Sequence, residues 1–75
     1  MNTRYYISFE LNGRTHSFYG DSSYPSEYLI KKDEVDLQIV IDNVFDFIKS
    51  YMEQMSLSGK VNPHTVHYRY EILKD

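Results

Sequence analysis

Residues 5–19 read YYISFELNGRTHSFY, and this stretch decides the fold. Apolar and polar side chains alternate as far as Leu11, and a second run rich in aromatic side chains begins after Asn12-Gly13. An Asn-Gly dipeptide between two such runs is the strongest short-range signal of a β-hairpin, because both central residues of a type I′ turn have positive φ. The two-residue loop sets the pairs across the hairpin: Leu11 with Arg14, Phe9 with His16, Ile7 with Phe18 and Tyr6 with Tyr19. The apolar face gains Phe18, and the open face carries Tyr6, Ser8, Glu10, Thr15, Ser17 and Tyr19.

A helix is expected in the middle of the chain. Residues 21–32 begin with turn-forming residues and end with a short apolar group, Tyr28 to Ile30, so we expect a loop that docks a few side chains on the core. Asp33 is the expected N-cap of the main helix, because aspartate is favoured there and acids in the first turn suit the positive end of the helix dipole. Gly59 stands where this helix is expected to end, and Asn62-Pro63 blocks its continuation.

The predicted helix has an unusually wide apolar side. At about 100° per residue, all but one of its apolar side chains fall within one arc of about 160°. The arc holds Leu37, Val40, Ile41, Val44, Phe45, Phe47, Ile48, Tyr51, Met52 and Met55. Ile39 alone falls on the polar side. An alternative remains, because apolar side chains also alternate over residues 35–41, as in a third strand, with the helix then beginning near Asp42. The long helix is the preferred prediction, since the arc and the N-terminal signals agree with it.

The last segment completes the predicted fold. Side chains alternate again from Thr65 to Leu73, which indicates a strand. The element order is therefore ββαβ. We predict an α+β fold, a two-layer sandwich in which one long helix packs on a three-stranded antiparallel sheet in the order 2-1-3. Residues 1–75 form a single domain in this prediction.

The composition excludes several classes of protein. The chain has 75 residues, a net charge of −3 and 25% charged side chains, which suits one small globular domain. The absence of cysteine excludes a disulfide framework and a thiolate zinc site. The longest uncharged apolar run, Ile39 to Ile41, is far too short to span a membrane, and the N-terminus lacks the apolar segment of a signal peptide. We therefore expect a cytoplasmic protein.

Few side chains suggest catalysis or metal binding. His64 and His67 are three residues apart, a spacing that places them on opposite faces of a strand. Ser8, Ser17 and His67 can meet on the open face of the sheet, but we expect that face to be flat and solvated, with nothing to bind an oxyanion. No glycine-rich phosphate loop is present, because the glycines stand singly in expected turns: Gly13, Gly20 and Gly59. We predict a non-enzymatic protein without metal or cofactor.

Acidic side chains gather on the polar side of the predicted helix. Residues 33–57 carry a net charge of −5, and Asp42, Asp46 and Glu53 fall opposite the apolar arc. Such a row is either only a solvated helix face or an anionic surface that steers association with a basic protein partner.

The open face of the sheet is the second candidate surface. It carries Tyr6 and Tyr19 beside Arg4, His67 and Arg69. Tyrosine supplies a large contact area at a low cost in entropy. Aromatic side chains interleaved with cations also occur on sheets that bind single-stranded RNA. An acidic pI of about 5.5 and two carboxylates on the same face, Glu10 and Glu71, argue against nucleic acid.

These surfaces predict a protein-binding module. Its partner contacts are expected at Asp42, Asp46, Glu53, Tyr6, Tyr19 and Arg69. The most concrete version is a small inhibitor or regulator of a nucleic-acid-handling complex, by analogy of type with the small acidic anti-defence proteins of phages, including anti-CRISPR proteins. The alternatives are a single-stranded nucleic-acid binder that uses the sheet face, and a structural homodimer or assembly subunit.

We also expect two copies of the chain to associate. Phe45 and Phe47 border an arc that is wider than one packing face of a helix needs, so we expect a homodimer interface there. A small chain without disulfides or metal gains stability from such an assembly. The other possible cover for one border is the segment from Tyr28 to Ile30.

Overall fold

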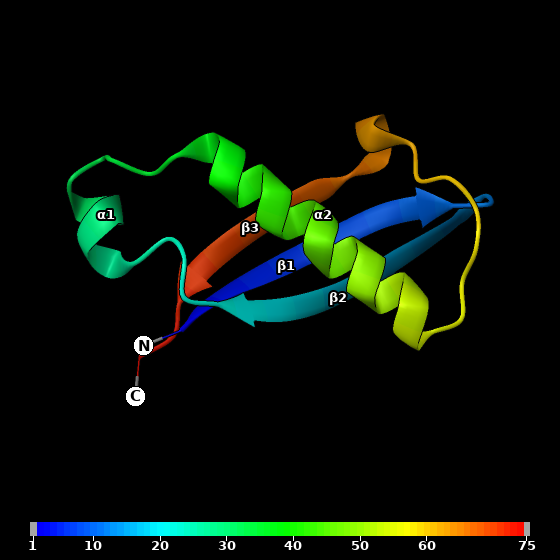
Figure 1. The fold of residues 1–75 in the computed structure, drawn as a ribbon, viewed down its shortest axis with the longest axis horizontal. Helices are drawn as coiled ribbons and strands as arrows, with labels where there is room; N and C mark the ends of the chain where they lie inside the picture. Colours follow the sequence, from blue (N-terminus) through cyan, green and yellow to red (C-terminus); the bar gives the residue numbers. More distant parts are fainter. Residues whose placement is uncertain (1, 75) are drawn as a thin grey trace.

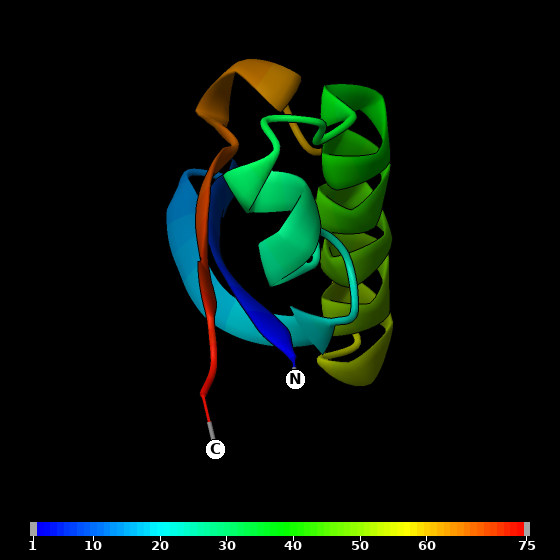
Figure 2. The same cartoon turned by 90° about the vertical axis from the view of Figure 1, so that its left-hand side faces the viewer.

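A computed structural model describes residues 2–74 of the chain (Figure 1). Its elements are β1 (Thr3–Leu11), β2 (Arg14–Ser22), α1 (Glu27–Lys31), α2 (Leu37–Gln54), the 3-10 turn η1 (Pro63–Thr65) and β3 (His67–Ile72). The strands form one antiparallel sheet in the order β2-β1-β3, and α2 lies across one face of it (Figure 2). The predicted α+β fold, with its two layers and its 2-1-3 sheet, is confirmed.

The hairpin of β1 and β2 has the predicted register. Asn12 and Gly13 have φ values of 54° and 78°, as the two central residues of a type I′ turn require. Tyr6 pairs with Tyr19 on β2, and on its other side it pairs with Arg69 on β3. The central position of β1 therefore brings together three residues that are far apart in the sequence.

The core lies between the sheet and α2. Alternate side chains of β1 are buried on the helix side, and three side chains spaced one turn apart along α2 meet them. The buried cluster consists of Tyr5, Ile7, Phe9, Leu11, Val40, Val44 and Ile48. Thr3 is also buried, and its hydroxyl donates to the Pro25 carbonyl at 2.6 Å. Since the strand alternates, the intervening side chains of β1 are left to the open face.

The long helix begins later than predicted. Asp36, not Asp33, is the N-cap, because its Oδ1 accepts a hydrogen bond from the Gln38 N–H at 2.9 Å. The Asp36 N–H donates to the Tyr24 hydroxyl at 2.7 Å, which fixes the chain just before the helix. Asp33 instead has a φ of 54° and follows α1. The alternative of a third strand over residues 35–41 is wrong, because α2 occupies most of that range.

Residues 21–32 are more regular than the predicted loop. β2 extends into this segment, and α1 follows with Ser26 as its N-cap. The side chains that pack on the core come from Tyr24 and from the fully buried Pro25. Tyr28 is 65% exposed, so it does not cover the helix.

Both helices end in a left-handed residue that is not glycine. After α2, Ser56 has a φ of 55°, and the Leu57 N–H donates to the Met52 carbonyl at 2.8 Å, which makes a Schellman motif. Asp33 takes the same position after α1. The prediction that Gly59 ends the main helix is wrong, because this glycine lies farther along the chain and packs near the hairpin turn.

The last strand is shorter than predicted. η1 replaces its expected start, and β3 begins at His67. Thr65, within η1, accepts a hydrogen bond from the Glu10 N–H through its hydroxyl at 3.1 Å. A side chain thus satisfies the backbone of β1 where β3 has not yet begun.

Candidate functional site

The face of the sheet that α2 does not cover bears a shallow depression. The shallow cavity on it has a volume of about 520 Å³. Its side-chain lining from this face comprises Tyr6, Ser8, Ser17, Tyr19, His67 and Arg69. This depression is wide and open to solvent. Three of the predicted contact residues, Tyr6, Tyr19 and Arg69, lie in it together.

Two arginines stack on two tyrosines of the open face. The Arg69 guanidinium lies 4.1 Å from the centre of the Tyr6 ring, and the Arg4 guanidinium lies 4.3 Å from the centre of the Tyr19 ring. The two ring centres are 6.5 Å apart. We call Arg4, Tyr6, Tyr19 and Arg69 the tyrosine face. Cation–π contacts of this kind hold the aromatic rings in place at an otherwise exposed surface.

Hydrogen bonds further fix the tyrosine face. Arg4 donates twice to the Asp21 carboxylate, at 2.8 and 3.1 Å, and the Tyr6 hydroxyl donates to Glu71 Oε1 at 2.8 Å. The hydrogen bond from Arg4 lowers the pKa of Asp21, and the hydrogen bond to Glu71 raises the pKa of Tyr6. Tyr6 is therefore held as a neutral hydrogen-bond donor.

The charges on the open face nearly cancel. Its cations are Arg4 and Arg69, and its carboxylates are Glu10, Asp21 and Glu71. Arg69 Nη1 lies 3.7 Å from Glu71, so each guanidinium has a carboxylate beside it. A surface for a phosphate backbone would instead present an excess of cations.

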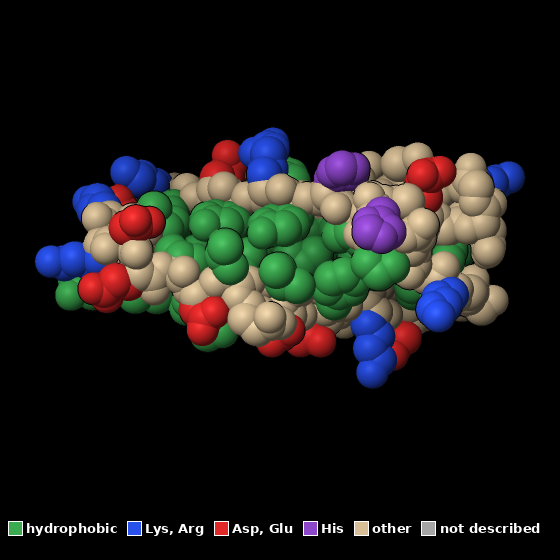
Figure 3. Space-filling model, turned by 90° about the horizontal axis from the view of Figure 1, so that it is seen from above, with side chains coloured by type: hydrophobic (Ala, Val, Ile, Leu, Met, Phe, Trp, Pro, Cys, Tyr) green, Lys and Arg blue, Asp and Glu red, His purple; other side chains and the backbone are tan. Residues whose placement is uncertain are grey.

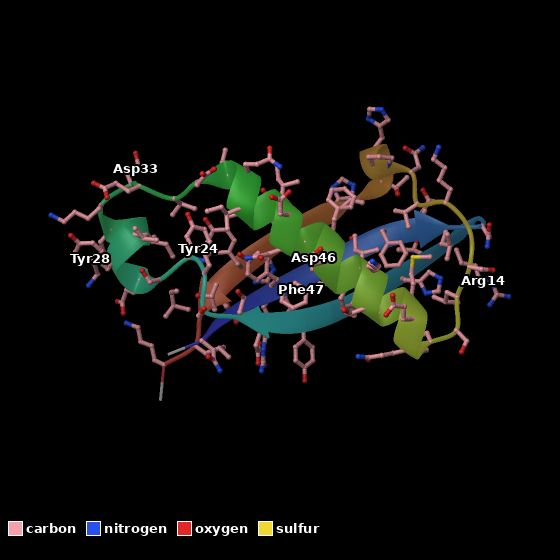
Figure 4. The ribbon with its side chains drawn as sticks, in the orientation of Figure 1. Arg14, Tyr24, Tyr28, Asp33, Asp46 and Phe47 are labelled. Carbon is pink, nitrogen blue, oxygen red and sulfur yellow. The ribbon has the colours of Figure 1, made fainter. Side chains whose placement is uncertain are left out.

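The predicted acidic residues lie on the opposite side of the molecule. Asp42, Asp46 and Glu53, which we call the acidic row, are all exposed on α2. Asp46 lies on the side of the helix that is turned away from the sheet (Figure 4). Gln38 donates to the Asp42 carboxylate at 2.9 Å. The structure therefore divides the predicted contact residues into two separate surfaces.

The two phenylalanines of the predicted dimer interface have different surroundings. Phe47 is half-buried, and its ring lies over Gly20 and 5.6 Å from the ring of Tyr5. Gly20 lies within β2, so the prediction that it stands in a turn is wrong. Phe45 is 39% exposed on the other flank of α2. Phe47 thus packs within its own chain, whereas Phe45 has a free surface.

The candidate catalytic side chains are serines and histidines. Ser8 pairs with Ser17 and with His67, so these side chains are neighbours on the open face. His16 stacks on Phe9, with its Nδ1 3.4 Å from the Tyr51 hydroxyl. Among residues 2–74, no group of three or more His, Cys, Asp or Glu side chains is placed to hold a metal ion.

Arg4 was expected on the open face but not among the partner contacts, although it stacks on Tyr19 and lies at the end of the tyrosine face. The signal was present, since Arg4 stands two residues before Tyr6 and therefore shares its face of β1. Its partner Asp21 was missed because the segment after Gly20 was expected to be a loop.

The chain matches no protein-family model, no curated protein and no solved structure at a significant level. In the described residues 2–74, no helix is both long enough and apolar enough to cross a membrane.

Proposed function

We propose that this chain is a non-enzymatic, cytoplasmic protein-binding module and that the tyrosine face is its main contact surface. The observation that carries the proposal is the stacking of Arg69 on Tyr6 and of Arg4 on Tyr19. Tyrosine and arginine dominate the binding energy of many protein interfaces, and rings that are already fixed lose little entropy on binding. The shallow cavity between them fits a side chain of a partner protein.

The shape of the open face supports binding rather than catalysis. The serines and His67 lie in a shallow depression that water enters freely. General base and oxyanion chemistry depends on donors that act where water is excluded. A protein partner needs only the exposed rings and their neighbouring polar groups.

Single-stranded nucleic acid is the alternative ligand for the same rings. The stacking of bases on Tyr6 and Tyr19 would suit it. However, Arg4 is already engaged by Asp21 through two hydrogen bonds, and Glu71 lies beside Arg69. Phosphates would have to displace these carboxylates, so the charges favour a protein partner.

The acidic row supports a second candidate function, inhibition or regulation of a nucleic-acid-handling complex. Such complexes carry basic grooves, and Asp42, Asp46 and Glu53 present carboxylates along the exposed side of an 18-residue helix. Carboxylates in such a row steer the approach of a basic surface. This candidate predicts strong salt dependence of binding, whereas the tyrosine face predicts a weak one.

Affinity capture from the native host, followed by titration of the captured protein, tests both surfaces. We expect the variant with Tyr6→Ala and Tyr19→Ala to bind at least about tenfold more weakly. Tyr28→Ala is the matched control, because Tyr28 is exposed but lies on α1, outside the tyrosine face. Equal binding by the double tyrosine variant and the wild type would overturn the proposal.

Two further arms separate the other candidates. A loss of binding on Asp42→Lys with Asp46→Lys, but not on the tyrosine changes, would assign the contact to the acidic row. Salt-sensitive binding of a single-stranded oligonucleotide would favour the nucleic-acid alternative.

We also propose that the working unit is a homodimer. Leu37, Ile41 and Phe45, on one flank of α2, are 62%, 37% and 39% exposed. Exposed apolar side chains that lie together on a small protein commonly mark an interface.

A further inference from the structure

Within residues 2–74, no strand pairs with the outer edge of β3. β3 is an end strand of the sheet, and the Leu73 N–H donates to the Asn2 carbonyl at 2.8 Å just past its end. Hydrogen-bonded pairs alternate with non-bonded pairs along an antiparallel ladder. Leu73 faces β1, and so do Glu71, Arg69 and His67, whereas the residues between them direct their N–H and C=O away from β1. These residues are Tyr68, Tyr70 and Ile72.

An exposed apolar strip runs beside this edge. We define the strip as Leu37, Ile41, Phe45 and Tyr68, whose side chains are between 37% and 62% exposed. Figure 3 shows a continuous hydrophobic band along the side of the molecule between the acidic exterior of α2 and β3. The other flank of the helix is covered, because Phe47 packs on β2. The unpaired backbone and the uncovered apolar surface thus lie on the same side.

We propose that two copies of this chain pair through β3, antiparallel, about a twofold axis at Tyr70. This inference deepens the proposed homodimer and is independent of which partner the tyrosine face binds. Tyr70 then faces the partner's Tyr70 as a hydrogen-bonded pair, and Tyr68 faces the partner's Ile72 in the same way. All three outward residues of β3 are satisfied, and the two sheets become one continuous sheet.

Charge complementarity selects this register. With the axis at Tyr70, Arg69 lies directly opposite the partner's Glu71, and symmetry repeats the pair. Directly opposed side chains of unlike charge stabilise an antiparallel pair, and like charges destabilise it. A shift of the axis to Arg69 would place Arg69 opposite the partner's Arg69. A shift to Glu71 would place Glu71 opposite the partner's Glu71. Only the register centred on Tyr70 places Arg69 and Glu71 opposite unlike charges and also pairs the outward N–H and C=O groups of all three residues within the two β3 strands.

The same axis brings the apolar strips together. Antiparallel pairing about a twofold axis perpendicular to the sheet keeps both copies of α2 on one face of the joined sheet. The strip of each copy then lies on the same face of the joined sheet as the paired Tyr70 side chains. The edge strand and the apolar strip are thus covered by one contact, which a foreign strand alone would not achieve.

Sedimentation of the full chain from about 1 to 100 µM tests this pairing. We expect a mass of twice 9.0 kDa. Arg69→Glu, or Glu71→Arg, places like charges opposite each other and should weaken the dimer by about tenfold or more. The variant with both changes restores unlike pairs and should dimerise within about threefold of wild type. Arg14→Glu, the same charge change on β2, is the control that should leave the dimer unchanged.

Amide exchange followed by NMR gives a second readout within one strand. The Arg69 and Glu71 amides face β1 and should exchange slowly at every concentration, whereas the Tyr68, Tyr70 and Ile72 amides should become slow only as the dimer forms. A monomer at about 100 µM would overturn both this pairing and the homodimer itself. Two results would overturn the β3 pairing but not the homodimer. One is a dimer in which the Tyr68, Tyr70 and Ile72 amides still exchange rapidly, and the other is a dimer whose affinity is unchanged by the charge substitutions.

Discussion

The ring of Phe47 lies where the Cβ of residue 20 would stand if that residue were not glycine. A Cβ built on Gly20 comes within 2.6 Å of Phe47 Cδ1 and 3.0 Å of its Cγ. The missing side chain on β2 is therefore what lets α2 approach the sheet, and the two residues form one packing unit.

Gly20→Ala should destabilise the fold by about 1 to 3 kcal/mol, because the new methyl group displaces an aromatic ring near its base. Without this ring the same change would stabilise a strand, since glycine loses more entropy on folding than alanine. Urea unfolding measures the difference. The matched comparison is Gly20→Ala in a Phe47→Leu background, where the penalty should shrink. An unchanged or increased stability of Gly20→Ala alone would contradict the packing described here.

Ser56→Gly should stabilise the protein by about 0.5 to 1 kcal/mol, because Ser56 holds a φ of 55° that costs a residue with a Cβ. Thermal or urea unfolding gives the difference in stability. Ser50→Gly is the control, since Ser50 is exposed within α2, and there glycine should cost about 0.5 kcal/mol. Opposite signs for the two serines are expected, and a loss of stability at Ser56 would count against the Schellman motif.

Ile48→Ala should cost about 2 to 5 kcal/mol, because Ile48 is 3% exposed and faces the centre of the sheet. Ile39→Ala removes the same atoms from a side chain that is 41% exposed, and it should cost much less. Unfolding curves of the two variants test the orientation of α2. Equal costs would mean that the helix is rotated about its axis.

Asp21 should contribute to stability only above acid pH. Its folded pKa is lowered by the hydrogen bond from Arg4, so the folded state binds its proton less tightly than the unfolded state. This contribution is fully present above the unfolded pKa of about 3.9 and is lost as the pH falls through the lower, folded value. Asp21→Asn should flatten the dependence of unfolding free energy on pH below about pH 4. Arg4→Gln should flatten it to the same extent, and an unaltered slope in either variant would show that the pair is not formed in solution.

The sequence specified the sheet better than the ends of the helices. The hairpin was predictable residue by residue. Asn12-Gly13 favours a two-residue type I′ turn, and the length of this turn places Tyr6 opposite Tyr19. The start of α2 was not predictable, since Asp33 and Asp36 are both good N-cap residues. The Asp36 N–H donates to the hydroxyl of Tyr24, and this contact lies outside the local sequence pattern.

The candidate site was predictable only in part, for a related reason. Alternation placed Tyr6, Tyr19 and Arg69 on one face, and the structure brings them together. Local pattern gave no sign that Phe47 would pack over a strand glycine while Phe45 stayed exposed, because the two residues border the same arc. Which border is covered depends on the direction in which α2 crosses the sheet.

The two-layer arrangement affects how many molecules one copy of the chain can contact at once. The tyrosine face and the acidic row lie on opposite outer surfaces, with the whole core between them, so a molecule bound to one leaves the other accessible. If both proposed contact surfaces bind a partner, a single copy links two molecules. The proposed twofold axis would present each surface twice in a fixed orientation, and avidity would then strengthen binding to an array of targets without any new contact.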